Sequence, residues 1–188
     1  ADATRAAFGV PHLVFNNAGV ATGGLLWEHG LADWHWVLGV NLMGVVHGVH
    51  AFPAMMLEAA AAAPDDEGPI VNTASISALM GGYNLAAYTA TKGAMNTLTK
   101  SMALDYAGDG IRVNAVAPGF MATPMVAMLP PEFVAELLRD VEFPKRAGTG
   151  EDFAAAIDFL IRTPLVNGEV LRLDGGARPP ARTQWASN

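Results

Sequence analysis

Residues 85 to 119 read LAAYTATKGAMNTLTKSMALDYAGDGIRVNAVAPG and place a long helical pattern directly before an apolar strand. Apolar side chains recur at helical spacing in the first part, which predicts a helix over Leu85–Tyr106. Ile111–Ala117 is an apolar run rich in valine that closes at Pro118-Gly119, as buried strands do. A helix that feeds a buried strand in this way indicates one unit of a parallel α/β sheet.

The same alternation extends in both directions along the chain. Further strands are expected at His12–Phe15, Pro69–Thr73 and Glu169–Leu173. Further helices are expected at Ala1–Phe8, at Leu31–Ala63 in one or two pieces, and at Asp152–Ile161, and Pro64–Gly68 is expected to be a polar turn. The sequence therefore predicts one α/β domain over residues 1–188, with four parallel strands.

Composition limits the classes of function. Apolar residues make up 52% of the chain and charged residues 15%, which excludes a disordered chain and suits a sheet buried on both faces. The formal net charge is −7 and the basic residues are scattered, so no nucleic-acid partner is expected. The chain has no cysteine, which excludes disulfides and thiolate metal sites and fits a cytoplasmic protein.

The stretch Trp34–Leu57 contains no charged residue and is long enough to span a membrane. Its histidines, Asn41 and glycines favour instead a helix buried at a subunit interface, so no membrane contact is expected. No signal-peptide pattern occurs in residues 1–10. His47 and His50 share a helix face, but no third ligand stands at a matching spacing, so no metal site is expected.

Tyr88 and Lys92 are four residues apart on the predicted helix, and this spacing puts both side chains on one face. A phenol with a pKa near 10 is a poor proton donor or acceptor at neutral pH. An ammonium group beside it favours the phenolate and brings the pKa toward a useful range. The pair alone could also be a coincidence of spacing.

Three other positions could belong to the same site. Ser75 follows the end of a predicted strand, where it could donate to a carbonyl oxygen or be a simple turn residue. Asn41 is a polar residue inside an apolar helix, where it could stabilise a helix break or hold a water in a proton path. Pro118-Gly119 ends a strand, which is where open α/β sheets bind ligands.

Together these residues resemble the short-chain dehydrogenase/reductase family over essentially the whole chain. The features that carry the resemblance are Asn16-Asn17-Ala18-Gly19, Asn41, Ser75, Tyr88 with Lys92, Pro118-Gly119 and Asp174-Gly175-Gly176. The resemblance implies a Rossmann-like doubly wound sheet and hydride transfer between NAD or NADP and a carbonyl or secondary alcohol. It also implies a small-molecule substrate and assembly into a homodimer or homotetramer.

The resemblance further implies a role for each matched residue. Tyr88 would be the general acid/base, Ser75 would polarise the substrate carbonyl, Lys92 would tune Tyr88 and hold the nicotinamide ribose, and Asn41 would anchor a relay water. Contacts with the cofactor are expected from Asn16, Asn17, Ala18, Gly19, Thr73, Tyr88, Lys92, Pro118, Gly119, Met121 and Thr123. The turn at residues 16–19 would lie on the adenosine side of the cofactor.

The chain departs from the family at its start. The resemblance places two further βαβ units, roughly 60 residues, before Ala1, and these units carry the phosphate-binding turn and the residue that selects NAD or NADP. The expectation is therefore a chain without its first βαβαβ half. It would be part of a working oxidoreductase or, alternatively, a catalytically silent remnant that acts only through subunit association.

The substrate is indicated only weakly. Apolar residues near the predicted site suggest an adaptable apolar pocket or, equally, ordinary packing; these residues are Leu79, Met80, Tyr83, Met121, Met125 and Met128. The stretches at 142–146 and 168–174 are similar to the 3-hydroxyacyl-CoA and hydroxysteroid dehydrogenase branch. The Tyr88 helix is similar to 3-oxoacyl-carrier-protein reductases. We expect an apolar 3-oxo or 3-hydroxy compound of the acyl type.

Overall fold

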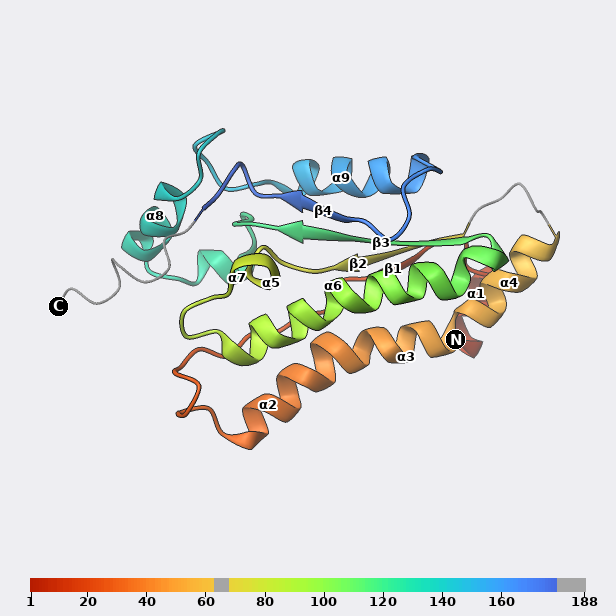
Figure 1. The fold of residues 1–188 in the computed structure, drawn as a ribbon, viewed down its shortest axis with the longest axis horizontal. Helices are drawn as coiled ribbons and strands as arrows, with labels where there is room; N and C mark the ends of the chain where they lie inside the picture. The colour runs from red at the N-terminus through yellow and green to blue at the C-terminus, as the bar shows by residue number, and fades with distance from the viewer. Residues whose placement is uncertain (63–67, 179–188) are drawn as a thin grey trace.

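The four predicted strands form one parallel sheet, in the order in which they occur along the chain (Figure 1). The computed structural model describes residues 1–62 and 68–178, so the predicted turn at Pro64–Gly68 lies outside the described residues except for Gly68. The strands are β1 (Val14–Asn16), β2 (Gly68–Thr73), β3 (Ile111–Pro118) and β4 (Val170–Leu173). Each is parallel to its neighbour.

Helices cover both faces of this sheet, which confirms the α/β prediction. On one side lie α6 and the α2–α3 segment, and on the other side lies α9 (Figure 1). The helical elements are α1 (Asp2–Phe8), α2 (Leu31–Leu38), the π-helical turn η1 (Gly39–Met43), α3 (Gly44–Ala51), α4 (Pro53–Ala62), α5 (Ser77–Met80), α6 (Ala86–Tyr106), η2 (Ala107–Asp109), α7 (Pro124–Ala127), α8 (Pro131–Arg139) and α9 (Gly150–Arg162).

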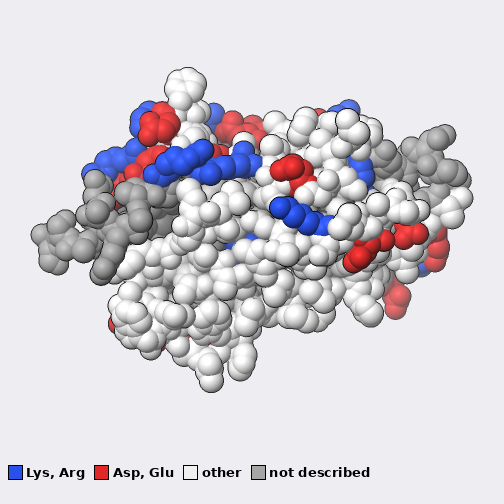
Figure 2. All heavy atoms as spheres, viewed as in Figure 1, with Lys and Arg blue, Asp and Glu red and all other residues white. Residues whose placement is uncertain are grey.

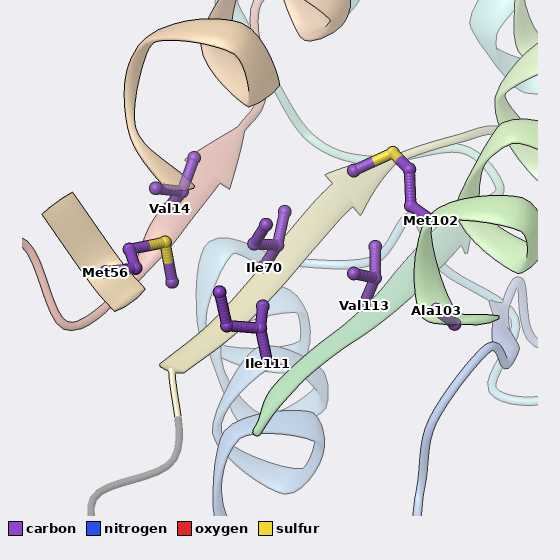
Figure 3. Packing of buried hydrophobic residues seen from close by; sticks show 7 residues of the cluster. All are labelled: Val14, Met56, Ile70, Met102, Ala103, Ile111 and Val113. Atoms are coloured by element: carbon purple, nitrogen blue, oxygen red, sulfur yellow. The ribbon is translucent and has the colours of Figure 1, made fainter. Parts of the chain in front are cut away.

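The two central strands form the middle of the core. Residues 68–72 of β2 and 111–117 of β3 are buried without alternation, as expected for strands covered on both faces. Figure 3 shows the cluster on the α6 side, where Ile70, Ile111 and Val113 of the sheet meet Met102 of α6. On the α9 side, Val71 and Val116 pack against Leu160.

The helix predicted at Leu31–Ala63 is broken into several pieces. A π-helical turn interrupts it at Gly39–Met43, and α4 starts after Phe52. By length and composition alone, Leu31–Ala59 could cross a membrane: it has 29 residues, and its most apolar window has a mean hydropathy of 1.3 and is 22% buried. Figure 2 shows little charge on the surface over α2 and α3. Val37, Asn41 and Val45 are buried within the fold, as in a helix packed on a sheet.

Two helices between β3 and α9 were not predicted. The sequence pattern predicted no element at residues 120–149, but α7 and α8 lie there. Helix α8 begins at Pro131, and no side chain caps its first turn, so the usual polar signal of a helix start is missing. By contrast, α9 begins with a capping box in which Thr149 and Asp152 each accept the other's backbone N–H.

Gly48 of α3 allows the helix to approach β1 closely. A Cβ at this position would lie 2.7 Å from Oδ1 of Asn16. The Asn16 side chain is held in turn, because its Nδ2 donates to Oδ1 of Asn72 at 2.9 Å. Nδ2 of Asn72 donates to Oγ1 of Thr99 at 3.0 Å. Gly48 therefore makes room for a buried polar chain that connects β1, β2 and α6.

Replacing Gly48 with alanine is expected to lower the free energy of unfolding by about 1–3 kcal/mol, because the new methyl group has no space beside Asn16. Gly44, one turn earlier, is the matched control, since a Cβ there would find only the carbonyl oxygen of Gly39, at 3.9 Å. Denaturant unfolding of the two alanine variants checks this. Equal effects at the two positions would show that the close approach to Asn16 is unimportant.

Candidate active site

Three of the predicted catalytic side chains meet beyond the carboxyl end of β2. Ser75 lies two residues after β2, and its backbone is held because Ala74 N donates to Val116 O at 2.7 Å and Ile76 N donates to Pro118 O at 3.1 Å. Tyr88 and Lys92 occupy neighbouring turns of α6, and the lysine Nζ lies 5.8 Å from the centre of the tyrosine ring. The predicted sharing of one helix face is therefore observed.

Lys92 is an almost fully buried cation. Its side chain is 3% exposed, and Nζ donates to the carbonyl oxygen of Thr73 at 2.6 Å. Burial lowers the pKa of Lys92 to about 8 because the interior disfavours the ammonium. The ammonium group has three hydrogens to donate, and the bond to Thr73 uses one of them. Lys92 could therefore also bind a hydroxyl group in front of it.

The balance of effects on Tyr88 differs from the sequence-based expectation. Burial raises the pKa of the Tyr88 phenol above its usual value, and a hydrogen bond with the Ser75 side chain lowers it by less. The expected lowering by Lys92 is not among the causes of this shift, which are burial and the bond with Ser75; burial also disfavours the charge on Lys92 itself. The Tyr88 phenol is therefore neutral at neutral pH and can act as a proton donor.

Asn41 lies in the π-helical turn, and its side chain makes three hydrogen bonds to protein groups. Oδ1 accepts from Val20 N at 2.8 Å, while Nδ2 donates to Val20 O at 2.9 Å and to Oγ1 of Thr91 at 3.0 Å. Turns of this kind within α-helices occur frequently at functional sites. The side chain of Asn41 thus holds the loop that follows β1, and the relay water assigned to it remains a prediction.

The turn at residues 16–19 lies beside Lys92 and Asn41, but not all of its side chains face them. A Cβ on Gly19 would lie 3.5 Å from Lys92 Nζ and 3.6 Å from Asn41 Oδ1, so the turn passes directly over the lysine. Oδ1 of Asn17 accepts from Oγ1 of Thr73 at 2.9 Å. The side chain of Asn16 is instead engaged with Asn72 in the interior.

Three residues after β3 that were predicted to contact the cofactor, Gly119, Met121 and Thr123, form hydrogen bonds or close contacts with residues later in the sequence. Gly119 donates its N–H to Leu173 O at 2.9 Å, and a Cβ there would lie 2.7 Å from Asp174 Cβ, so only glycine fits. Met121 pairs its backbone with Gly148. Thr123 caps α7, with its Oγ1 accepting from Val126 N.

Two residues of this site were missed in the sequence. Val20 supplies both backbone partners of Asn41, and Thr91 lies between Asn41 and the Tyr88 carbonyl. A loop residue such as Val20 carries no sequence signal. Thr91 does carry a weak one, because it is a hydroxyl residue directly before Lys92 on the helix that bears the catalytic pair.

The arrangement fits a nicotinamide cofactor at the carboxyl edge of the sheet. Polar and glycine residues follow β1, β2 and β3 side by side, as the site of a ligand in an open α/β sheet requires. Gly19 keeps the space over Lys92 and Asn41 free of a side chain. Lys92 could hold ribose hydroxyls there, while the turn at residues 16–19 could border the adenosine side.

The family model, a relative and a solved structure that match this chain are all described as reductases or dehydrogenases. Residues 1–178 match the family described as "Enoyl-(Acyl carrier protein) reductase". The chain is 36% identical over 177 residues to 3-hydroxyacyl-CoA dehydrogenase type-2 of Homo sapiens, which covers 91% of this chain and 68% of that protein. The 3-oxoacyl-[acyl-carrier protein] reductase of Brucella melitensis superposes with a TM-score of 0.80 at 34% identity, covering 89% of this chain and 63% of that one.

A second solved structure bears on the cofactor. The 3-ketoacyl-(acyl-carrier-protein) reductase of Brucella melitensis, complexed with NADH, superposes with a TM-score of 0.84 at 28% identity. The superposition covers 93% of this chain and 70% of the reductase. The chain spans 58% to 69% of the length of its relatives called 3-hydroxyacyl-CoA dehydrogenase type-2.

Proposed function

Because the chain belongs to the short-chain dehydrogenase/reductase family, we propose that it carries the catalytic residues of an NAD- or NADP-dependent oxidoreductase. The reaction is hydride transfer between the cofactor and a carbonyl or secondary alcohol. The observation that supports this most strongly is the convergence of Ser75, Tyr88 and Lys92 at the end of β2.

In the proposed mechanism Tyr88 is the general acid and base. Its phenol is kept neutral by burial, so in the reductive direction it donates its proton to the substrate oxygen. The Ser75 hydroxyl lies beside it and donates to the same oxygen, which favours the developing negative charge. The cofactor, when bound, supplies or accepts the hydride. Lys92 stabilises the resulting phenolate and binds the ribose next to it.

The proposed substrate is an apolar 3-oxo or 3-hydroxy compound of the acyl type. The names of the relatives support this class, since they refer to 3-hydroxyacyl-CoA and to 3-oxoacyl-carrier-protein. Leu79 of α5 and Tyr83, between α5 and α6, lie on the segment that joins Ser75 to Tyr88, and they are 47% and 43% exposed, so they could contact an apolar chain. The side chain of Met125 lies outside the described residues.

A spectrophotometric assay with 3-oxoacyl thioesters tests this function. The full-length protein is mixed with NADH or NADPH and with a short-chain or medium-chain thioester, and loss of the reduced cofactor is followed. Consumption that depends on the thioester is expected with one of the two cofactors. If neither reduced cofactor is consumed with any thioester or simple ketone, and neither NAD+ nor NADP+ is reduced with any secondary alcohol, the alternative of a catalytically silent remnant that acts through subunit association is favoured.

We also propose that a second copy of the chain binds over α3 and α6. An open groove there is lined by the apolar side chains of Val46, Val49, Leu98 and Met102, together with His50, Asp105 and Tyr106. The neighbouring stretch Trp34–Leu57 has no charged residue, so the α3 side of this face is free of charge, and Asp105 is the one carboxylate among the lining residues. A cytoplasmic location and the absence of nucleic-acid and membrane partners stay predictions from composition.

Val46→Asp is expected to convert the proposed dimer or tetramer to smaller species, because it places a carboxylate, in addition to Asp105, on the apolar side of the groove. Val46 is 37% exposed, so the fold itself has little reason to change. Light scattering coupled to size-exclusion chromatography measures the mass of the wild type and of Val46→Asp, and circular dichroism checks that the variant is folded. An unchanged mass in a folded variant would place the interface elsewhere.

A further inference from the structure

We propose that Thr91 is a positioning residue, which couples the loop after β1 to the turn of α6 that carries Tyr88 and Lys92. Its side chain is fully buried, at 0% exposure, between Asn41 and the backbone of its own helix. This inference rests on the proposed oxidoreductase function and concerns a residue that does not itself touch substrate.

The direction of each hydrogen bond at Thr91 follows from the chemistry of its partners. The backbone N–H of Val20 can only donate, so the Asn41 atom that faces it is the carbonyl oxygen Oδ1. The amide nitrogen Nδ2 therefore points toward Thr91 and donates to its Oγ1 at 3.0 Å. The hydroxyl hydrogen of Thr91 is then free to donate to the carbonyl oxygen of Tyr88, at 2.7 Å.

The result is a directed chain of hydrogen bonds that runs from Asn41 through Thr91 to Tyr88. Both Val20 and Gly19 lie at the start of this chain, and Gly19 passes over Lys92. Bonds arranged in one direction polarise one another, so loss of the central hydroxyl weakens the whole chain. Thr91 is the described residue through which the Asn41 side chain reaches the turn of α6 that holds the catalytic pair.

Other contacts of the site do not depend on Thr91. Lys92 is held by Thr73, and Tyr88 is bonded to Ser75. Removal of the Thr91 hydroxyl should therefore loosen the placement of Tyr88 without removing any group that contacts substrate. We expect the turnover number to fall while the Michaelis constants change little.

The test compares Thr91→Val with Thr91→Ser in the full-length protein. Thr91→Val keeps the shape and removes the hydroxyl, and kcat is expected to fall about tenfold with KM nearly unchanged. Thr91→Ser keeps the hydroxyl and is expected to restore kcat. The phenol titration of Tyr88, followed by ultraviolet difference spectra against Tyr88→Phe, should move to higher pH in Thr91→Val, because the hydrogen bond from Ser75 that lowers the pKa becomes weaker.

Thr99→Val is the matched control. Thr99 is equally buried on the same helix and accepts from Asn72, away from the catalytic pair. It should lower the melting temperature and leave both kcat and the Tyr88 titration unchanged. The inference is overturned if Thr91→Val leaves kcat and the titration as in the wild type, or if Thr99→Val moves them equally. Should the wild type show no turnover, the proposed function fails, and the titration alone decides the role of Thr91.

Discussion

Replacing Tyr88 with phenylalanine is expected to lower kcat by roughly 10²–10⁴-fold, which is the usual contribution of a positioned general acid or base. The phenol is a proton donor that burial keeps neutral and that also contacts Ser75. Phenylalanine preserves the ring beside Lys92 and removes only the hydroxyl. Stopped-flow or steady-state measurement of cofactor consumption, with cofactor affinity followed by fluorescence, separates loss of chemistry from loss of binding.

Tyr106→Phe is the control for this substitution. Tyr106 ends the same helix, so the change removes the same hydroxyl group far along α6 from Ser75. We expect this variant to retain wild-type kcat and the Tyr88 variant to retain cofactor affinity. Full turnover in Tyr88→Phe would remove the tyrosine from the mechanism. Loss of cofactor affinity in parallel with kcat would show that the hydroxyl serves binding instead.

The predictable parts of this fold are those whose signal is local in the sequence. β2 and β3 were recognisable because a strand buried on both faces is a continuous apolar run, and the structure extends these predictions by one residue each, to Gly68 and Pro118. The pairing of Tyr88 with Lys92 followed from helical spacing alone. The family comparison supports the sheet class, while the roles of the site residues remain to be measured.

The parts that could not be predicted depend on long-range contacts or lack a local signal in the sequence. Asn41 was recognised as a polar residue in an apolar helix, but its partner Val20 is 21 residues away in a loop without regular structure. The interruption at Gly39–Met43 is a π-helical turn, which has no distinctive composition. Helix α8 was missed because its start has no capping side chain. For Asn41 the deciding contact joins residues whose proximity only the folded chain defines.

The balance of charge at the site was also beyond sequence reasoning. Spacing indicated that Lys92 would lower the pKa of Tyr88, but it could not indicate how deeply either group is buried. Burial acts on the two residues in opposite directions, because it disfavours the phenolate on one and the ammonium on the other. Burial of the Lys92 ammonium therefore lowers the free energy of unfolding, and we infer that the residue is kept for its function despite this cost.

Lys92→Met is expected to reveal that cost as a change in the pH dependence of stability. The folded-state pKa is about 8 and the ordinary value is 10.5, so below about pH 8 the ammonium destabilises the fold by about 3 kcal/mol. As the pH rises from about 8 to 10.5, the folded protein loses this proton before the unfolded chain does, and the penalty disappears. Relative to Lys92→Met, the wild type should therefore gain about 3 kcal/mol across this interval.

Denaturant unfolding of the wild type and Lys92→Met at several pH values measures this difference, which includes the weakening of the hydrogen bond to Thr73 when the ammonium becomes a neutral amine. Lys100→Met, at an exposed position on the same helix, controls for removal of a lysine charge. Turnover of Lys92→Met should fall by roughly 10²-fold or more, because the phenolate of Tyr88 loses its neighbouring cation. Parallel stability curves for the wild type and Lys92→Met would show that the buried ammonium carries no penalty, and the balance of burial and charge proposed for this site would then be wrong.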